Sequence, residues 1–267
     1  MAIYNASGNM IIDSLADFID NMDFDYEFDS TSDANYTILR IYQTKIDGTK
    51  QYPFVFAPNG SGAGTMSTKD MMDANPQWLL AINGGIFTNS GADGIVIQNG
   101  VSIVNSPATS HVGAYPLTID SSGNLSYAAP DASTSTLISN GIKSAVCGFC
   151  PIVVDYEAVD ASYYNWIEHY AENAQRQIIG QFGNGDYAIL TSEGRNYQAS
   201  DGWTIAEAIA ICIKHGLKFA YNLDGGGSTE TMLGKKHIND IYDGTTGRKV
   251  PTFICFAGGT TFPTLGS

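Results

Sequence analysis

Positively charged residues are scarce in this chain of 267 residues. Thirteen lysines and arginines stand against 27 aspartates and glutamates, which gives a formal net charge of −14. Nucleic acids and anionic membrane surfaces attract proteins through clustered cations, so this balance opposes non-specific binding to either. The composition therefore argues against a nucleic-acid polymer as partner.

Long apolar runs are also missing. No segment approaches the roughly 20 apolar residues that a membrane-spanning helix needs, so we expect no membrane insertion. The first residues, Met1 to Asn5, include no basic segment followed by an apolar core. This pattern predicts that the chain carries no signal peptide.

Cysteines are few, and their spacing completes no metal site. Cys147 and Cys150 form a Cys-x-x-Cys pair, but no second such pair or nearby Cys/His pair accompanies it. The following residues, Pro151 to Val154, are typical of a strand, whereas a thioredoxin-like motif requires a helix there. The polar loop with Asn89 and Asp93 matches no calcium-binding template. We predict buried thiols, no metal and no cofactor.

The residues that are abundant favour strands and loops. The chain is 43% hydrophobic and contains 29 glycines and 15 tyrosines. Its length fits one large domain with a short appendage. We place an appendage or cap at residues 1–30, with a short amphipathic helix from Ile11 to Ile19. The main domain then comprises residues 31–267.

Local signals predict the fold class. Asn99-Gly100, Ser121 to Asn124 and Gly183 to Asp186 each separate two apolar runs, which is typical of β-hairpins. One clear helix is expected from Ile205 to His215, because Thr204 and Glu207 can form a capping box before it. These features predict an α+β domain with a mixed, mostly antiparallel sheet core and packed helices.

Two stretches share one pattern: an apolar strand, a short polar side chain and consecutive glycines. They are Leu79 to Phe87, which contains Asn83, and Phe219 to Thr229, which contains Asp224. A single Asp-Gly pair would indicate only a capped turn. Two strands that end alike predict two edges of one cleft, where glycines let a ligand approach main-chain N–H groups.

The motif order resembles that of the phosphodiester glycosidase family. The motifs are Asn83 to Phe87, Arg176 to Gly180, Glu193 to Arg195 and Leu223 to Thr229, and the resemblance covers roughly residues 78 to 257. It implies a hydrolase that cleaves a sugar-1-phosphodiester such as an N-acetylglucosamine-1-phosphodiester, with residues 31–267 as the catalytic domain. The opening residues faintly resemble the starts of phage structural proteins, so we expect a cytoplasmic or phage virion-associated protein.

Such a reaction needs proton transfer near an oxocarbenium-like transition state, usually from a pair of carboxylates. Asp224 is the first candidate and Glu193 the second. Asp201 and Glu230 compete with Glu193, although we interpret Glu230 as an outward-facing strand residue. Which carboxylate is acid and which is base stays open.

The phosphate needs fixed donors. Of four arginines, Arg176, Arg195 and Arg248 lie in or beside the family-like motifs, and we predict that Arg176 and Arg195 clamp the phosphate from one end of a hairpin. Any one of them can instead pair with an acid. His111 and His169 fall where a cleft loop is expected, although a lone histidine is more often structural. The remaining candidates for binding the substrate are Asn83, Gly84, Gly85, Gly225, Gly226, Gly227, Ser228, Thr229 and His111.

Two other functions remain open. One is a non-catalytic glycan-binding virion module that uses the faces of Trp166 and Trp203. The other is a phosphodiesterase that cleaves a P–O bond in a nucleotide-like small molecule. The expected partner is a small-molecule or glycan phosphodiester, and the sequence leaves its identity and the oligomeric state open.

Overall fold

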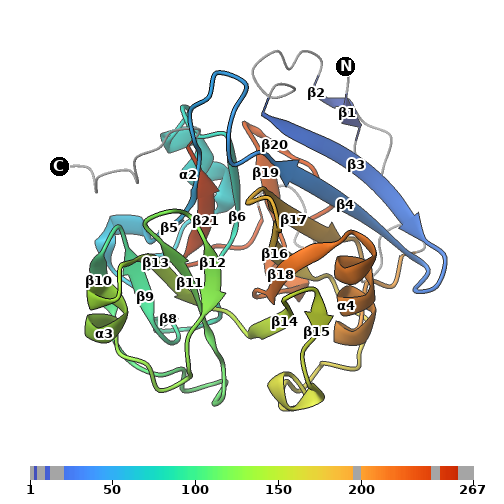
Figure 1. The fold of residues 1–267 in the computed structure, drawn as a ribbon. Coiled ribbons are helices and arrows are strands. Elements are labelled where there is room, and N and C mark those ends of the chain that lie inside the picture. The colour runs from blue at the N-terminus through green and yellow to red at the C-terminus, as the bar shows by residue number, and fades with distance from the viewer. Residues whose placement is uncertain (1–2, 5–9, 13–20, 195–199, 242–246, 258–267) are drawn as a thin grey trace.

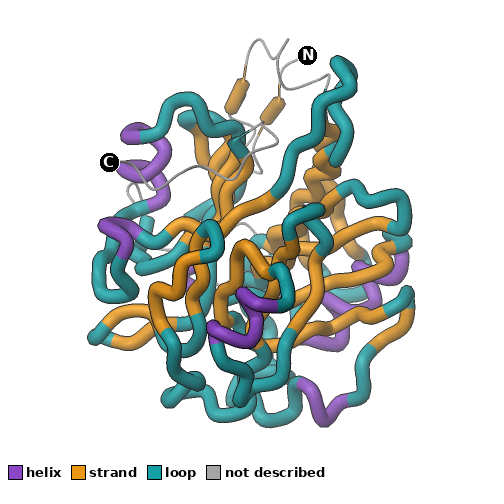
Figure 2. Tube along the Cα trace, turned by 60° about the vertical axis from the view of Figure 1, so that its left-hand side comes forward, coloured by secondary structure: helices purple, strands orange, loops and turns teal. Residues whose placement is uncertain are grey.

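Three antiparallel sheets surround one shared core, and each sheet carries a short helix on its other face (Figure 1). This computed structural model describes residues 3–4, 10–12, 21–194, 200–241 and 247–257. Figure 2 shows how few of these residues are helical. Within the described ranges, no helix is long and apolar enough to cross a membrane.

The largest sheet has seven strands and is covered by helix α4 (Ile205–Lys214). Successive side chains of a strand point to opposite faces, so Leu39 and Ile41 enter the shared core while Tyr36 and Ile38 pack toward α4. In spatial order the strands are β15 (Glu157–Ala158), β14 (Cys150–Val154), β18 (Leu217–Asn222), β16 (Gln177–Phe182), β17 (Tyr187–Ser192), β4 (Ala34–Ile41) and β3 (Met22–Asp29).

Two five-stranded sheets complete the shared core with residues such as Val55, Ile82, Val96 and Leu117. One contains β10 (Val101–Val104), β9 (Val96–Gln98), β13 (Ile142–Cys147), β11 (Pro116–Asp120) and β12 (Leu125–Tyr127), with helix α3 (Thr134–Ser139) beside it. The other contains β20 (Lys236–His237), β19 (Thr231–Leu233), β6 (Leu80–Asn83), β21 (Phe253–Phe256) and β5 (Pro53–Phe56), with helix α2 (Thr68–Ala74).

Short elements complete the described structure. Two small ribbons pair β1 (Ile3–Tyr4) with β2 (Met10–Ile12) and β7 (Phe87–Thr88) with β8 (Gly91–Ala92). Single 3₁₀ turns lie at Pro58–Gly60, Ala161–Tyr163 and Gly226–Ser228.

The structure confirms the elements that local signals predicted. The three expected hairpins are β9–β10, β11–β12 and β16–β17. Asn99 and Gly100 both have positive φ, 49° and 76°, as a tight two-residue hairpin turn requires. The capping box of Thr204 and Glu207 is present, and all four cysteines are buried free thiols.

The predicted fold class is confirmed only in its broad form. The sheets are antiparallel as expected, but every strand pair among the described residues is antiparallel, so the sheets are not mixed. Helices contribute less than predicted, because three short ones cover sheets that pack mainly on one another. The helix expected at Ile11–Ile19 begins inside strand β2, and residues 13–20 lie outside the described ranges.

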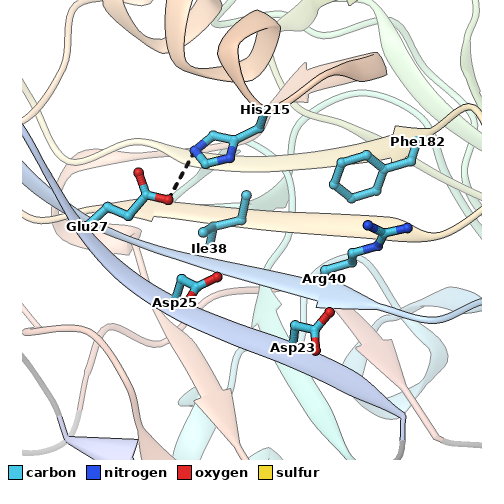
Figure 3. Close-up of a pocket in the computed structure, with 7 residues that line it drawn as sticks. All are labelled: Asp23, Asp25, Glu27, Ile38, Arg40, Phe182 and His215. Atoms are coloured by element: carbon cyan, nitrogen blue, oxygen red, sulfur yellow. Dashed lines mark ion pairs between the residues drawn. The ribbon is translucent and has the colours of Figure 1, made fainter.

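Most of the acidic segment at residues 20–29 forms the edge strand β3 (Met22–Asp29), which pairs along its length with β4. The proposed boundary at residue 30 therefore falls in the turn between two paired strands. Asp23, Asp25 and Glu27 share one face of β3 and line a pocket of about 220 Å³ beside α4 (Figure 3). Glu27 lies 3.7 Å from His215 and 3.1 Å from Lys214, so the segment is tied to the main sheet and to its helix.

Candidate active site

The two glycine-containing turns meet where two sheets join. Asn83 ends β6 and Asp224 follows β18. The Asn83 amide donates to the Asp224 carbonyl oxygen at 2.8 Å, and the Asp224 N–H donates to the Gly84 carbonyl at 3.4 Å. The side-chain oxygen of Asn83 accepts from the Glu230 N–H at 3.1 Å. Asn83 is only 1% exposed, so it holds the turns together, which corrects its predicted role as a ligand-binding side chain.

Gly84 and Gly85 are required by close packing. Their N–H groups donate to the main-chain oxygen and the hydroxyl of Thr252, at 2.9 and 3.0 Å. A Cβ atom on Gly85 would lie 2.2 Å from the Cys147 carbonyl oxygen, and one on Gly84 would lie 2.5 Å from the Thr252 hydroxyl. These N–H groups are bonded within the protein, whereas the sequence led us to expect that they bind a phosphate or a sugar hydroxyl of the substrate.

The second turn lines a pocket of about 540 Å³. Gly226 has a positive φ of 58°, and a Cβ placed there would meet no atom within 4 Å. The backbone of Gly226 therefore faces open space in the pocket. The lining residues are Ile86, Phe87, His111, Phe149, Ile167, Glu168, His169, Ala174, Arg176, Asp224, Gly225, Gly226, Gly227 and Arg248.

Asp224 contributes a carboxyl group to the pocket wall that this turn forms. Desolvation in the pocket raises its pKa to about 6, although hydrogen bonds from Ser228 and the Gly225 N–H and the positive charge of Arg248 act in the opposite direction. A carboxyl group with a pKa near the working pH can give or take a proton. The position predicted from the glycine pattern thus carries a group suited to proton transfer.

Arg248 supplies a cation to the same wall. Its guanidinium donates to the Ser228 hydroxyl oxygen at 3.2 Å, and its main-chain N–H donates to the Glu230 carboxylate at 2.7 Å. The Ser228 hydroxyl in turn bonds to Asp224. Ser228 therefore connects the acid and the arginine, and Glu230 fixes the chain that carries the arginine.

Arg176 lines the same pocket and supports a neighbouring loop. Its guanidinium donates to the main-chain oxygens of Trp203, His169 and Glu172 at 2.9, 2.7 and 2.9 Å. These bonds fix the loop that carries Glu168 and His169 into the pocket. Arg195, its expected partner in clamping a phosphate, lies outside the described residues.

Glu193 lies away from the lining residues. It is 1% exposed and accepts hydrogen bonds from the Asp240 N–H at 3.1 and 3.3 Å. Burial and then the nearby charge of Asp240 raise its pKa to about 8. The structure thus does not bring Glu193 and Asp224 together in one pocket.

Five other candidates are placed as follows. Glu230 is buried rather than outward-facing, because its carboxylate accepts the Arg248 N–H, and Asp201 is exposed. Thr229 is buried and does not line the pocket. Trp203 is fully buried and cannot stack on a sugar, whereas Trp166 packs against the pocket residue Phe149 with ring centroids 6.4 Å apart.

A family model for phosphodiester glycosidases matches residues 77–257. The chain belongs to this family. A curated relative, the SPbeta prophage-derived uncharacterized protein YomE of Bacillus subtilis (strain 168), is 29% identical over 191 residues. The match covers 70% of this chain but only 29% of that protein, so the chain spans less than a third of its relative's length.

Solved structures show the same fold at low identity. The zebrafish N-acetylglucosamine-1-phosphodiester alpha-N-acetylglucosaminidase catalytic domain, auto-inhibited by its pro-peptide, aligns with a TM-score of 0.68 and 16% identity. The alignment covers 96% of this chain and 86% of that one. A hypothetical protein from Synechocystis gives a TM-score of 0.72 at 13% identity, over 88% of this chain and 62% of that one.

The phosphodiester glycosidase motifs do not contain every residue of the pocket. Arg248, Phe149 and Glu168 line it, yet none of the three was predicted from the sequence as a site residue. For Arg248 a signal existed, because arginine is rare in the chain and this one lies beside a family-like segment. Phe149 and Glu168 reach the pocket through long-range packing, for which the sequence offers no local signal.

Proposed function

We propose that this protein is a hydrolase that cleaves sugar-1-phosphodiesters, with N-acetylglucosamine-1-phosphodiesters as the first class to test. Family membership supports the reaction type. The observation that carries the proposal is the chain of contacts from Arg248 through Ser228 to Asp224 along one wall of the pocket.

The chemistry of the bond fits this arrangement. When the C1–O bond breaks, negative charge grows on the departing phosphate and positive charge on the sugar. The Arg248 guanidinium stabilises the phosphate by charge-assisted hydrogen bonds. Asp224, with a pKa of about 6, is protonated in mildly acidic solution and gives its proton to the leaving oxygen.

Substrate charge provides the sharpest test. Arg248→Ala should lower kcat/KM for a sugar-1-phosphodiester by roughly 10- to 100-fold, since a charge-assisted hydrogen bond contributes roughly 1.5–3 kcal/mol. Cleavage of an uncharged aryl glycoside should change much less. The matched control is Arg40→Ala, because Arg40 pairs with Asp186 at 2.8 Å and lies outside the pocket. Equal losses on both substrates would mean that Arg248 does not act by stabilising the phosphate.

Hydrolysis in ¹⁸O-labelled water identifies the bond. Label in the sugar means C1–O cleavage, as proposed. Label in the phosphate would instead favour the phosphodiesterase that acts on nucleotide-like molecules. Saturable glycan binding without turnover across a panel of sugar-1-phosphodiesters would favour the glycan-binding module.

A further inference from the structure

A buried carboxylate anchors the loop that carries His111 into the pocket. Asp93 is 7% exposed and accepts hydrogen bonds from the N–H and hydroxyl of Thr109, at 2.8 and 2.9 Å. It also accepts the Ser110 N–H at 2.8 Å and the Ser110 hydroxyl. Four donors on one side chain fix the backbone directly before His111.

The same contacts determine where the Ser110 proton lies. Burial would raise the pKa of Asp93, but the hydrogen bonds from Ser110 and Thr109 outweigh burial and lower it. An ionised carboxylate only accepts, so the single hydroxyl proton of Ser110 points to Asp93. The Ser110 oxygen lies 2.8 Å from Nδ1 of His111 and can then only accept from it. Nδ1 of His111 therefore carries a proton.

A neutral imidazole with a proton on Nδ1 has a lone pair on Nε2. Nε2 has no hydrogen-bond partner among the described residues, and His111 lines the pocket with Asp224. The Phe149 ring meets the imidazole edge-on, with centroids 5.2 Å apart and an interplanar angle of 82°. Phe149 thus restrains the plane of the His111 ring, and Ser110 restrains its tautomer.

We propose that Asp93 and Ser110 are positioning residues that hold His111 with Nε2 unprotonated, so that His111 is the base that activates water in the pocket that Asp224 also lines. This inference rests on the proposed hydrolysis. As the water oxygen bonds to C1, its proton passes to Nε2. The electron pair of the C1–O bond leaves with the phosphate oxygen, which takes the proton of Asp224. The imidazolium then releases its proton to solvent, and Asp224 regains one from solvent.

The charges around His111 agree with a neutral base. Burial lowers the pKa of His111, while the charges of Asp93 and Glu168 act against burial without reversing it. Arg176 and Arg248 line the same pocket, and their positive charges disfavour a further one there. The pKa of His111 is below its usual range, whereas that of Asp224 is above its own, as a base and an acid working together require.

Kinetics test the positioning role. We expect Ser110→Ala to lower kcat by about 10- to 100-fold with little change in KM, the range for losing a group that orients another. The rising limb of the kcat–pH profile should move to lower pH, because Ser110 no longer stabilises the imidazolium. Ser110→Thr keeps the hydroxyl and should restore most activity, and His111→Gln should abolish the rising limb.

Thr109→Val is the matched control. It removes one hydroxyl bond to the same Asp93 carboxylate, whereas the hydrogen bond to His111 comes from Ser110, so kcat should stay within about twofold. A loss in Ser110→Ala that Thr109→Val reproduces, or that leaves the pH profile unmoved, would make the role of Ser110 merely structural and overturn the proposal.

The tautomer itself is measurable by ¹⁵N NMR of the imidazole, assigned with His111→Gln. The wild type should show Nδ1–H, and Ser110→Ala a mixture of tautomers. An Nε2–H tautomer in the wild type would overturn the inference whatever the substrate. A wild type with Nδ1–H that cleaves no sugar phosphodiester would contradict the proposed function, while the positioning of His111 would stand.

Discussion

Asp224 has a structural role through its backbone and a chemical role through its side chain. Its main-chain N–H and carbonyl hold the Asn83 turn, while its carboxyl group faces the pocket. The backbone bonds survive any change of side chain. Substitution can therefore separate the chemistry of the carboxyl group from the structure of the turn.

Asp224→Asn should leave the fold intact and lower turnover by roughly two to four orders of magnitude, the usual effect of losing a catalytic acid or base. The pKa of Asp224 is raised to about 6, so wild-type activity that needs the protonated acid should fall as the pH rises through about 6. That falling limb should be absent in the variant. The exposed Asp201, changed to Asn, is the control. Wild-type turnover in a folded Asp224→Asn protein would exclude Asp224 from the mechanism.

Gly85→Ala probes the joint between the sheets. The added Cβ would meet the Cys147 carbonyl oxygen at 2.2 Å, and a backbone atom cannot rotate away. We expect a loss of roughly 1–3 kcal/mol in the free energy of unfolding, measured with urea. Gly48→Ala is the comparison, because Gly48 has positive φ but open space, so it should cost only about 1 kcal/mol. Equal losses of unfolding free energy in the two variants would mean that the turn at Gly85 moves at little cost to make room for the added Cβ.

At the scale of elements, helix α4 leads directly into β18 and so places Asp224. Thr204→Ala removes the hydroxyl that accepts the Glu207 N–H at 3.2 Å. It should cost about 1 kcal/mol of unfolding free energy, while Thr204→Ser should cost little. Urea titrations followed by tryptophan fluorescence measure both. A Ser variant as unstable as the Ala variant would point to lost packing of the methyl group instead of lost capping.

Elements defined by neighbouring residues could be predicted from sequence. A capping box, an Asn-Gly turn or a glycine run acts over a few residues, so α4, three hairpins and the Asp224 turn were found. Placement between elements could not be predicted. The strands β4 and β5 follow each other along the chain, for example, yet they lie in different sheets. Glu193 and Glu230 likewise left no local signal that they are buried.

At the scale of the whole molecule, the buried pair Glu193 and Asp240 makes stability depend on pH. The pKa of Glu193 is raised from 4.5 to about 8, so the folded state holds a proton that the unfolded state releases near pH 4.5. Stability should therefore decline as the pH rises from about 4.5 through about 8 and level off above that range.

Glu193→Gln should reduce this decline, since a neutral amide oxygen can still accept from the Asp240 N–H. We expect the variant to exceed the wild type by a few kcal/mol at pH 9 and by much less at pH 5, on the order given by about 1.4 kcal/mol per pKa unit. Urea unfolding at both pH values measures the difference. An identical pH dependence in both proteins would show that Glu193 is ionised in the folded state.

The pocket walls come from segments as far apart as Ile86 and Arg248, and its two central turns follow strands of different sheets. No short contiguous fragment of the chain contains the site. The proposed hydrolysis would therefore report assembly. Two separately produced halves, cut in the exposed turn around Ser122, should acquire activity only on recombining. The time course of that recovery would give the rate at which the sheets dock.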